Sequence, residues 1–311
     1  MIIGNNLKKN KMKKLLLFSG FLAFLMTGCY EDYKTDYEYT AAYFANQYPV
    51  RTVIIDQDAD LFEIKVGATY GGKYSYDGTS QILDFAIEDT LITNNPEFVD
   101  MGIKVMPSSW YTLSNNSTIN IKNSNIGFVN VSIIKDSLIK HPEASKITYA
   151  IPFKLIASTT DSILASKSFS IVAVKFKNEF DGRYYVKGTD NTLNLDGSIA
   201  SSSVYSNPAL VLNKYIYLNT KEKDVLEVPR IVTNESASNF VYNLKFRPSD
   251  GTALLSAVPG TNIIELVGGA QYNYEKKLFI NKYNYKYNNI EHMVIDTLFY
   301  QNTEIKMESW K

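Results

Sequence analysis

The sequence predicts an all-β protein, and three observations support this prediction. Short stretches alternate between apolar and polar residues with a period of two, which is the pattern of half-buried strands. Val, Ile, Phe and Tyr fill the inward positions, and loops rich in Asn, Ser and Gly separate the stretches. No long amphipathic helix with capping residues follows residue 40. We therefore expect strands throughout, with helix confined to short turns within 87–91 and 136–140.

The first residues of the chain predict a targeting segment that is separate from the fold. A lysine-rich stretch precedes an apolar run over 15–25, which ends in small residues and the chain's single cysteine, Cys29. This order is typical of a secretory signal peptide, and a small residue directly before cysteine is typical of the lipoprotein variety. A transmembrane anchor is the alternative, but a span needs about 20 apolar residues. We expect a signal peptide over 1–28, lipidation of Cys29 and a tether over 29–39.

The mature chain left by cleavage before Cys29 is mildly acidic. The signal contains five lysines and no acidic residue, so the remaining chain has 27 basic and 32 acidic residues. A net charge of about −5 gives no reason to expect nucleic acid or anionic headgroups as partners. With Cys29 lipidated, no cysteine remains for a disulfide, a thiolate metal site or a nucleophile.

Residues 40–177 are expected to form an immunoglobulin-like β-sandwich. The segments 61–66 and 128–133 alternate cleanly, and 169–176 is apolar almost throughout, as expected of a central strand. About seven such strands with turn-rich connections suit a sandwich of this size. The charged, turn-forming run 178–182 then interrupts the pattern and predicts a domain boundary.

Residues 178–311 are expected to form a C-terminal antiparallel β-barrel or half-barrel, lipocalin-like in its strand order. Here the strands are longer and follow one another at hairpin spacing, most clearly at 215–218, 240–246 and 278–287. A second sandwich would give the same local pattern. The sequence pattern therefore leaves barrel and sandwich open for this domain.

Patterns that carry chemistry are scarce. The two histidines, His141 and His292, lack metal-ligand spacing, and the acidic run 56–60 lacks the glycine and distal glutamate of a calcium loop. There is no Gly-x-Ser-x-Gly nucleophile motif. A glycosidase needs only two facing carboxylates, and nothing selects a pair among the 32 acidic residues. We predict no catalytic residue, no metal site and no cofactor.

Aromatic residues are the remaining candidates for ligand binding. Sugars pack their C–H faces on aromatic rings, and the chain holds 23 tyrosines and two tryptophans. The candidates are Trp110, expected in a loop, Tyr74 and Tyr76 in a turn-rich run, and Tyr285 in the alternating stripe 283–287. The alternative is that the stripe lines a core and that Trp110 closes one end of the sandwich.

Several segments resemble one family of Bacteroidetes proteins. They are the cysteine-terminated signal and residues 41–52, 62–67, 105–111, 119–131 and 149–153. Together they resemble domain of unknown function 1735, a β-sandwich that opens many surface lipoproteins of polysaccharide-utilisation loci. The last part resembles the β domain that commonly follows it. Glu31 and Asp32 also resemble the acidic signal that exports such lipoproteins. The resemblance implies a glycan-associated role at the cell surface, and no catalytic residue carries over.

These observations lead to one expected function and two alternatives. We expect a non-catalytic lipoprotein of the outer membrane that faces the cell exterior and binds glycan within a carbohydrate-uptake system. Its expected partners are an oligo- or polysaccharide and outer-membrane transporter components, with membrane contact through the lipid anchor only and no nucleic acid. The alternatives are a scaffold lipoprotein that binds protein partners and a small glycosidase or esterase.

Overall fold

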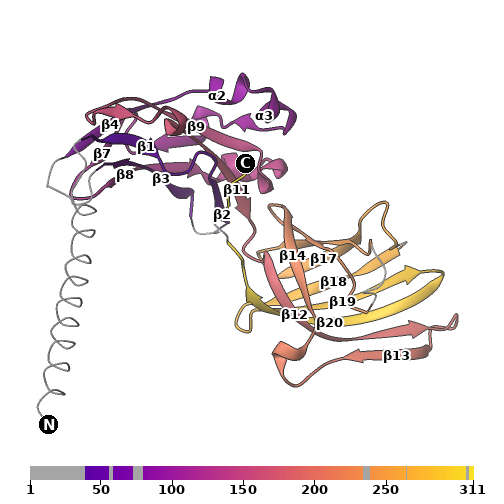
Figure 1. The fold of residues 1–311 in the computed structure, drawn as a ribbon. Coiled ribbons are helices and arrows are strands. Elements are labelled where there is room, and N and C mark those ends of the chain that lie inside the picture. The colour runs from indigo at the N-terminus through magenta and orange to yellow at the C-terminus, as the bar shows by residue number, and fades with distance from the viewer. Residues whose placement is uncertain (1–38, 56–58, 73–79, 234–238, 264, 306–307) are drawn as a thin grey trace, which may run out of the picture.

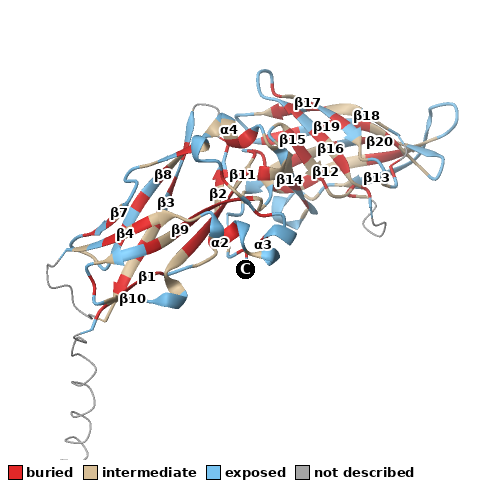
Figure 2. Cartoon of the chain, turned by 90° about the horizontal axis from the view of Figure 1, so that it is seen from above, coloured by how far each residue is buried: buried red, intermediate tan, exposed pale blue. Residues whose placement is uncertain are grey.

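The structure is a computed structural model that describes residues 39–311 except 56–58, 73–79, 234–238, 264 and 306–307. Within this part of the chain the prediction of an all-β fold is confirmed. A β-sandwich precedes a β-barrel, and Figure 1 shows the two as separate bodies. Figure 2 shows that the buried residues follow the strands of both.

The sandwich contains two sheets, with strand orders β10-β1-β3-β8-β6 and β2-β11-β9-β4-β7, and β5 adds to β9. It has more strands than the seven or so expected. Its strands are β1 (Ala41–Phe44), β2 (Val50–Ile54), β3 (Leu61–Gly71), β4 (Gln81–Ile87), β5 (Lys104–Val105), β6 (Tyr111–Leu113), β7 (Thr118–Ile121), β8 (Ile126–Ile134), β9 (Tyr149–Ser158), β10 (Ser162–Ile163) and β11 (Phe169–Lys177).

Helix in the described residues is limited to short segments, as expected. The α-helical turns are α2 (Thr90–Thr93), α3 (Pro96–Asp100) and α4 (Lys135–Ile139). The 3-10 turns are η1 (Ser108–Trp110), η2 (Pro142–Ser145), η3 (Ala165–Lys167) and η4 (Leu210–Leu212). No described helix is long and apolar enough to span a membrane.

Alternation along the strands builds the sandwich core. On β3, Phe62 and Ile64 point inward and lie opposite Ile133 and Val131 of β8. Each such side chain contributes about 1.5–3 kcal/mol through burial. Strand β11 is buried on both faces, which explains why its sequence is apolar almost throughout.

The barrel is closed, which confirms the barrel prediction for the second domain. Eight strands follow an up-and-down order, and β20 closes the sheet by pairing with β12 from Arg183↔Asn302 to Leu193↔Glu291. Among the described strands, β13 pairs with β12 alone and lies outside the closed ring. The strands are β12 (Gly182–Leu193), β13 (Ile199–Tyr205), β14 (Tyr215–Glu222), β15 (Val225–Val228), β16 (Tyr242–Arg247), β17 (Thr252–Ala257), β18 (Glu265–Asn273), β19 (Leu278–Tyr287) and β20 (Ile290–Asn302).

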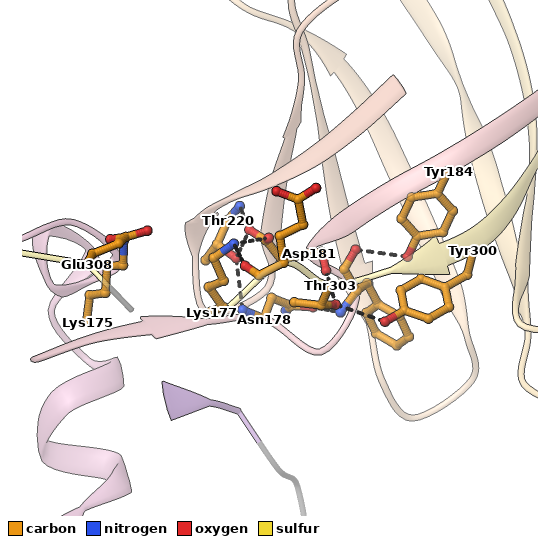
Figure 3. Close-up of polar contacts among 11 residues, drawn as sticks. Lys175, Lys177, Asn178, Asp181, Tyr184, Thr220, Tyr300, Thr303 and Glu308 are labelled. Carbon is orange, nitrogen blue, oxygen red and sulfur yellow. Dashed lines mark hydrogen bonds and ion pairs between the residues drawn. The ribbon is translucent and has the colours of Figure 1, made fainter. Parts of the chain in front are cut away.

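A polar network holds the junction between the two domains (Figure 3). Asp181 accepts hydrogen bonds from the backbone N–H and the hydroxyl of Thr220, at 2.7 and 2.8 Å, and forms an ion pair with Lys177 at 2.8 Å. Asn178 donates its side-chain amide to the carbonyl of Lys223 at 2.6 Å. Asn178 and Asp181 are both buried, so these contacts fix the link between β11 and β12 against the first barrel strands.

The chain returns to the sandwich after the barrel. Ser309 forms an antiparallel bridge with Pro49, and Glu308 pairs with Lys175 at 2.7 Å. Trp310 is 8% exposed and donates its indole N–H to the carbonyl of Ile171 at 2.9 Å. Although the predicted boundary places residues 308–311 in the second domain, they pack on the outer face of the second sandwich sheet.

Candidate functional site

Tyr285, a predicted glycan contact, lies inside the barrel. Its side chain is 1% exposed, its hydroxyl donates to Asp190 at 3.2 Å, and its ring stacks on His292 with centroids 4.4 Å apart. The prediction of a ring available to a sugar is therefore wrong at this position. Because Lys282 and Lys286 of the same strand face outward, the odd-numbered tyrosines between and beyond them must face the core.

Tyr285 belongs to a buried polar cluster in the barrel interior. Asp190 also accepts a hydrogen bond from Thr233 and lies 2.9 Å from Nδ1 of His292. Beside it, Asp296 accepts from the hydroxyls of Tyr205 and Tyr283, and its burial raises its pKa to about 6. The two carboxylates are 5% and 1% exposed, so a polysaccharide has no access to them. This cluster stabilises the barrel interior through mutual hydrogen bonds.

Trp110 lies at the end of η1, and its ring is half-buried. It packs on His141, with centroids 4.6 Å apart, and on Tyr149 at 4.9 Å. One side of the indole thus covers the end of the sandwich, as the structural alternative expected. Tyr74, Tyr76 and Cys29 lie outside the described residues, so their predicted roles stay predictions.

A shallow groove of about 830 Å³ opens next to Trp110. Polar side chains of Asp89, Ser108, Thr112 and Asn116 line it together with Tyr111. Burial, and then the charge of Asp89, raises the pKa of Tyr111, whose side chain is 8% exposed. The groove offers hydrogen-bonding groups for a ligand, but its tyrosine presents little surface for stacking.

Aromatic side chains instead gather on the outer face of the barrel. On β14, Ile216 and Leu218 point into the core, so Tyr215 and Tyr217 point outward and are 39% and 38% exposed. Tyr185 of β12 is paired with Tyr215 on one side and with Phe299 of β20 on the other. We call this surface the tyrosine platform; it consists of Arg183, Tyr185, Tyr215, Tyr217 and Phe299.

The register of the strands sets the dimensions of the tyrosine platform. Neighbouring strands lie about 4.8 Å apart, so the row Tyr215–Tyr185–Phe299 extends over about 10 Å. That length is comparable with two successive sugar rings. Tyr185 and Phe299 have a paired strand on both sides, whereas Tyr215 and Tyr217 pair with β12, and the pairing of β14 with β15 begins at Asn219.

Cations hold the rings of the platform in place. The guanidinium of Arg183 lies 3.8 Å from the ring centroid of Tyr215 and 5.6 Å from that of Tyr185. Arg230 lies 5.9 Å from the Tyr215 ring, and the Nζ of Lys187 lies 5.8 Å from the Phe299 ring. Such cation–π contacts contribute about 0.5–1 kcal/mol at exposed sites. They restrict the rings before any ligand binds.

A shallow hollow of about 370 Å³ continues the platform along β12. Lys187, Thr189, Ser206 and Thr297 line it with polar groups, and Val204 and Ile295 add apolar surface. Rings, hydroxyls and an ammonium group therefore meet on one side of the barrel. This combination can stack on the apolar face of a ligand and hydrogen-bond its polar edge.

The sequence contains a signal for the platform in the residues that neighbour its tyrosines. In Tyr215-Ile216-Tyr217-Leu218, the aliphatic residues are expected to fill the core, which leaves the tyrosines outside. Arg183, Tyr185 and Lys187 alternate with Tyr184 and Val186 in the same way. A tyrosine that alternates with aliphatic residues is thus a better candidate than one that alternates with lysine. Across the described ranges, no group of three or more His, Cys, Asp or Glu residues is arranged to hold a metal ion.

Comparisons with known proteins identify related folds. A family model described as "-like, N-terminal domain" matches residues 35–162, which covers most of the sandwich. No curated protein matches the chain. A structure of unknown function from Bacteroides ovatus is 20% identical, with a TM-score of 0.69 over 88% of this chain and 98% of that one. The chain therefore shares its two-domain fold with a Bacteroides protein.

Two other solved structures are less similar to this chain. A second structure of unknown function from Bacteroides ovatus is 11% identical, covers 87% of this chain and 98% of that one, and has a TM-score of 0.41. EndoBT-3987 with a Man5GlcNAc product, from Bacteroides thetaiotamicron, is 16% identical over 41% of this chain and 28% of that one, with a TM-score of 0.32.

Proposed function

We propose that this protein is a non-catalytic glycan-binding protein that holds a saccharide chain on the tyrosine platform. The observation that carries the proposal is the row Tyr215–Tyr185–Phe299, fixed by strand register on the outer face of the barrel. Sugars offer C–H faces to such rings, and the hydroxyls and cations around them can bond the sugar's oxygens. The carbohydrate-associated role implied by the sequence resemblance agrees with this assignment.

Its setting is part of the same proposal. Lipidation of Cys29 would tether the protein to the outer membrane, with the domains facing the cell exterior and the segment 29–39 as a spacer. A surface glycan would then be captured close to the transporter components of an uptake system. This part rests on the signal sequence and on the resemblance described above.

The experiment is calorimetry of the mature chain against a panel of plant, host and microbial polysaccharides. Weak binding in the micromolar to millimolar range is expected, about −4 to −8 kcal/mol. The double variant Tyr215→Ala/Tyr217→Ala should lose at least tenfold in affinity. Phe128→Ala is the matched control, because Phe128 is a 51% exposed ring on the sandwich and should leave binding unchanged.

Two outcomes would reject the assignment. Binding that is insensitive to the double variant would place the saccharide elsewhere, with the groove beside Trp110 as the next surface to test. Lack of binding across the whole panel would remove the glycan function itself.

One observation favours the scaffold alternative. Strand β13 has a free edge, carries no charged residue over Ile199–Tyr205, and exposes Val204 by 67% and Ile199 by 57%. Such an edge can accept a strand from another protein. If no polysaccharide of the panel binds and a partner lipoprotein co-purifies with the wild type, the scaffold alternative can be tested with Ser202→Lys. This change should abolish capture of the partner.

A further inference from the structure

The cations around the tyrosine platform have no acidic partner among the residues that the structure describes. Arg230 donates to the backbone carbonyl of Tyr215 at 2.5 Å, and Lys187 donates to the carbonyl of Pro208 at 3.4 Å. The Nε of Arg183 is shielded from solvent and has no hydrogen-bond partner. Among the described residues, none of these three cations forms an ion pair with a carboxylate.

Some cations elsewhere in the described part of the chain do form ion pairs. Lys175, Lys177 and Arg247 each pair with a carboxylate, at 2.7, 2.8 and 3.4 Å. The mature chain is acidic in total, so cations without partners are not the result of a shortage of acidic residues. Three uncompensated positive charges on one surface create a local positive field on an acidic protein.

Of the acidic residues near the platform, Asp296 points into the barrel, and Glu227 lies on the outward face beyond the platform's edge. Asp296 lies on β20 next to Thr297, but its side chain points into the barrel, where it is 1% exposed. On the β14 side, Glu227 of β15 lies opposite Asn219, two residues beyond Tyr217. The outward face between Tyr217 and Phe299 therefore presents aromatic rings and positive charges.

Strand geometry places these charges beside the rings. Arg183 and Lys187 flank Tyr185 on the same face of β12, each about 7 Å from it along the strand. A sugar stacked on Tyr185 would have a cation within reach at either end of its ring. A carboxylate or sulfate group on that sugar, or on the next one, can then pair with Arg183, Lys187 or Arg230.

We propose that the tyrosine platform binds an acidic glycan, one that carries uronate carboxylates or sulfate esters. This inference rests on the proposed glycan-binding function and specifies the class of saccharide. The rings supply contact with the sugar faces, and the cations select for negative charge. Because the cations are exposed, the selection should weaken as salt screens it.

The test compares polygalacturonate with the same polymer after reduction of its carboxylates to neutral galactose units. Affinity is measured by calorimetry at about 50 and 500 mM NaCl, where the Debye length falls from about 14 to about 4 Å. We expect the acidic polymer to bind at least tenfold more tightly at low salt, and the difference to fall several-fold at high salt. Chondroitin sulfate and desulfated chondroitin form a second matched pair for sulfate.

Two single variants locate the effect. Lys187→Gln should reduce affinity for the acidic polymer about threefold to tenfold, and affinity for the neutral polymer by a smaller factor, because a neutral sugar loses a hydrogen bond but no ion pair. Lys245→Gln is the matched control, because Lys245 is an exposed, outward lysine on β16, away from the platform. Both lysines are partly or fully exposed, so neither change should affect folding.

The outcomes separate this inference from the proposed function. Equal binding of both polymers, sensitive to Tyr215→Ala/Tyr217→Ala, would keep the function and overturn the acidic specificity. Equal binding of double-stranded DNA and polygalacturonate would indicate unspecific attraction of polyanions and also overturn it. If neither polymer of either pair binds, and no polysaccharide of the panel binds either, both proposals fail.

Discussion

Replacement of Trp310 by alanine is expected to destabilise the sandwich, although the residue follows the barrel in the chain. The indole packs against Tyr48 and Phe98, with ring centroids 5.2 and 4.9 Å away, in a cluster that also includes Val50 and Ile92. This cluster covers the outer face of the second sheet. Without the indole, apolar surface of α3 and β11 would be open to water.

The size of the effect follows from the burial of the side chain. Replacing a buried tryptophan by alanine costs about 3–5 kcal/mol. Loss of the indole donor also leaves the carbonyl of Ile171 without its partner, which costs about 1 kcal/mol or more. At a urea dependence of about 1–3 kcal/mol per molar, the midpoint of sandwich unfolding should fall by on the order of 1–6 M.

Trp110 provides the assay. The chain has two tryptophans, so Trp310→Ala leaves Trp110 in the sandwich as the single indole reporter. Trp310→Phe also leaves Trp110 as the single indole reporter but keeps an aromatic ring. It should lose less unfolding free energy than Trp310→Ala. A loss below about 1 kcal/mol for Trp310→Ala would refute the reasoning, because it would mean that the tail contributes little to the sandwich.

Two further predictions concern the barrel and the anchor. Burial raises the pKa of Asp296 from its ordinary value of 3.8 to about 6 in the folded barrel. The folded state therefore binds the proton more tightly, and the stability of the barrel should fall as pH rises from about 4 to 6, by on the order of 3 kcal/mol. Asp296→Asn should reduce this dependence of stability on pH and raise the urea midpoint of the barrel at neutral pH. Unfolding is followed by circular dichroism at pH 5 and 7.5. A urea midpoint lower than that of the wild type at pH 7.5 would contradict the argument. Cys29→Ser should release the protein from the membrane fraction, and a variant that stays bound and keeps residues 1–28 would indicate a transmembrane anchor.

Local pattern was sufficient to predict strands, but not the side of the sheet on which a tyrosine lies. Tyr215 and Tyr285 both alternate with other residues in a long strand. The neighbours of Tyr215 are aliphatic and occupy the core, whereas those of Tyr285 are Asn284 and Lys286, which face outward. The residues on either side of a tyrosine therefore indicate whether its ring faces the core or the solvent. The tyrosine stripe alone did not indicate this, and Tyr285, chosen from that stripe, is buried.

Long-range pairing explains the other limits of the sequence interpretation. Closure of the barrel depends on contact between β12 and β20, which are separated by most of the domain, and no local pattern reveals it. The packing of Trp310 on Phe98 is equally remote in sequence. The short strands β5, β6 and β10 lack a clear period and are held by their partners, which accounts for the low strand count expected for the sandwich.

The return of Trp310 to the sandwich has a consequence for the order in which the protein acquires its stability. A ribosome makes the sandwich strands first, yet this domain lacks one of its large buried rings until the whole barrel has been synthesised. A nascent chain that has reached residue 177 should therefore hold a weakened, protease-sensitive sandwich. If the chain is exported as we propose, such a delay would keep the first domain from folding stably before translocation.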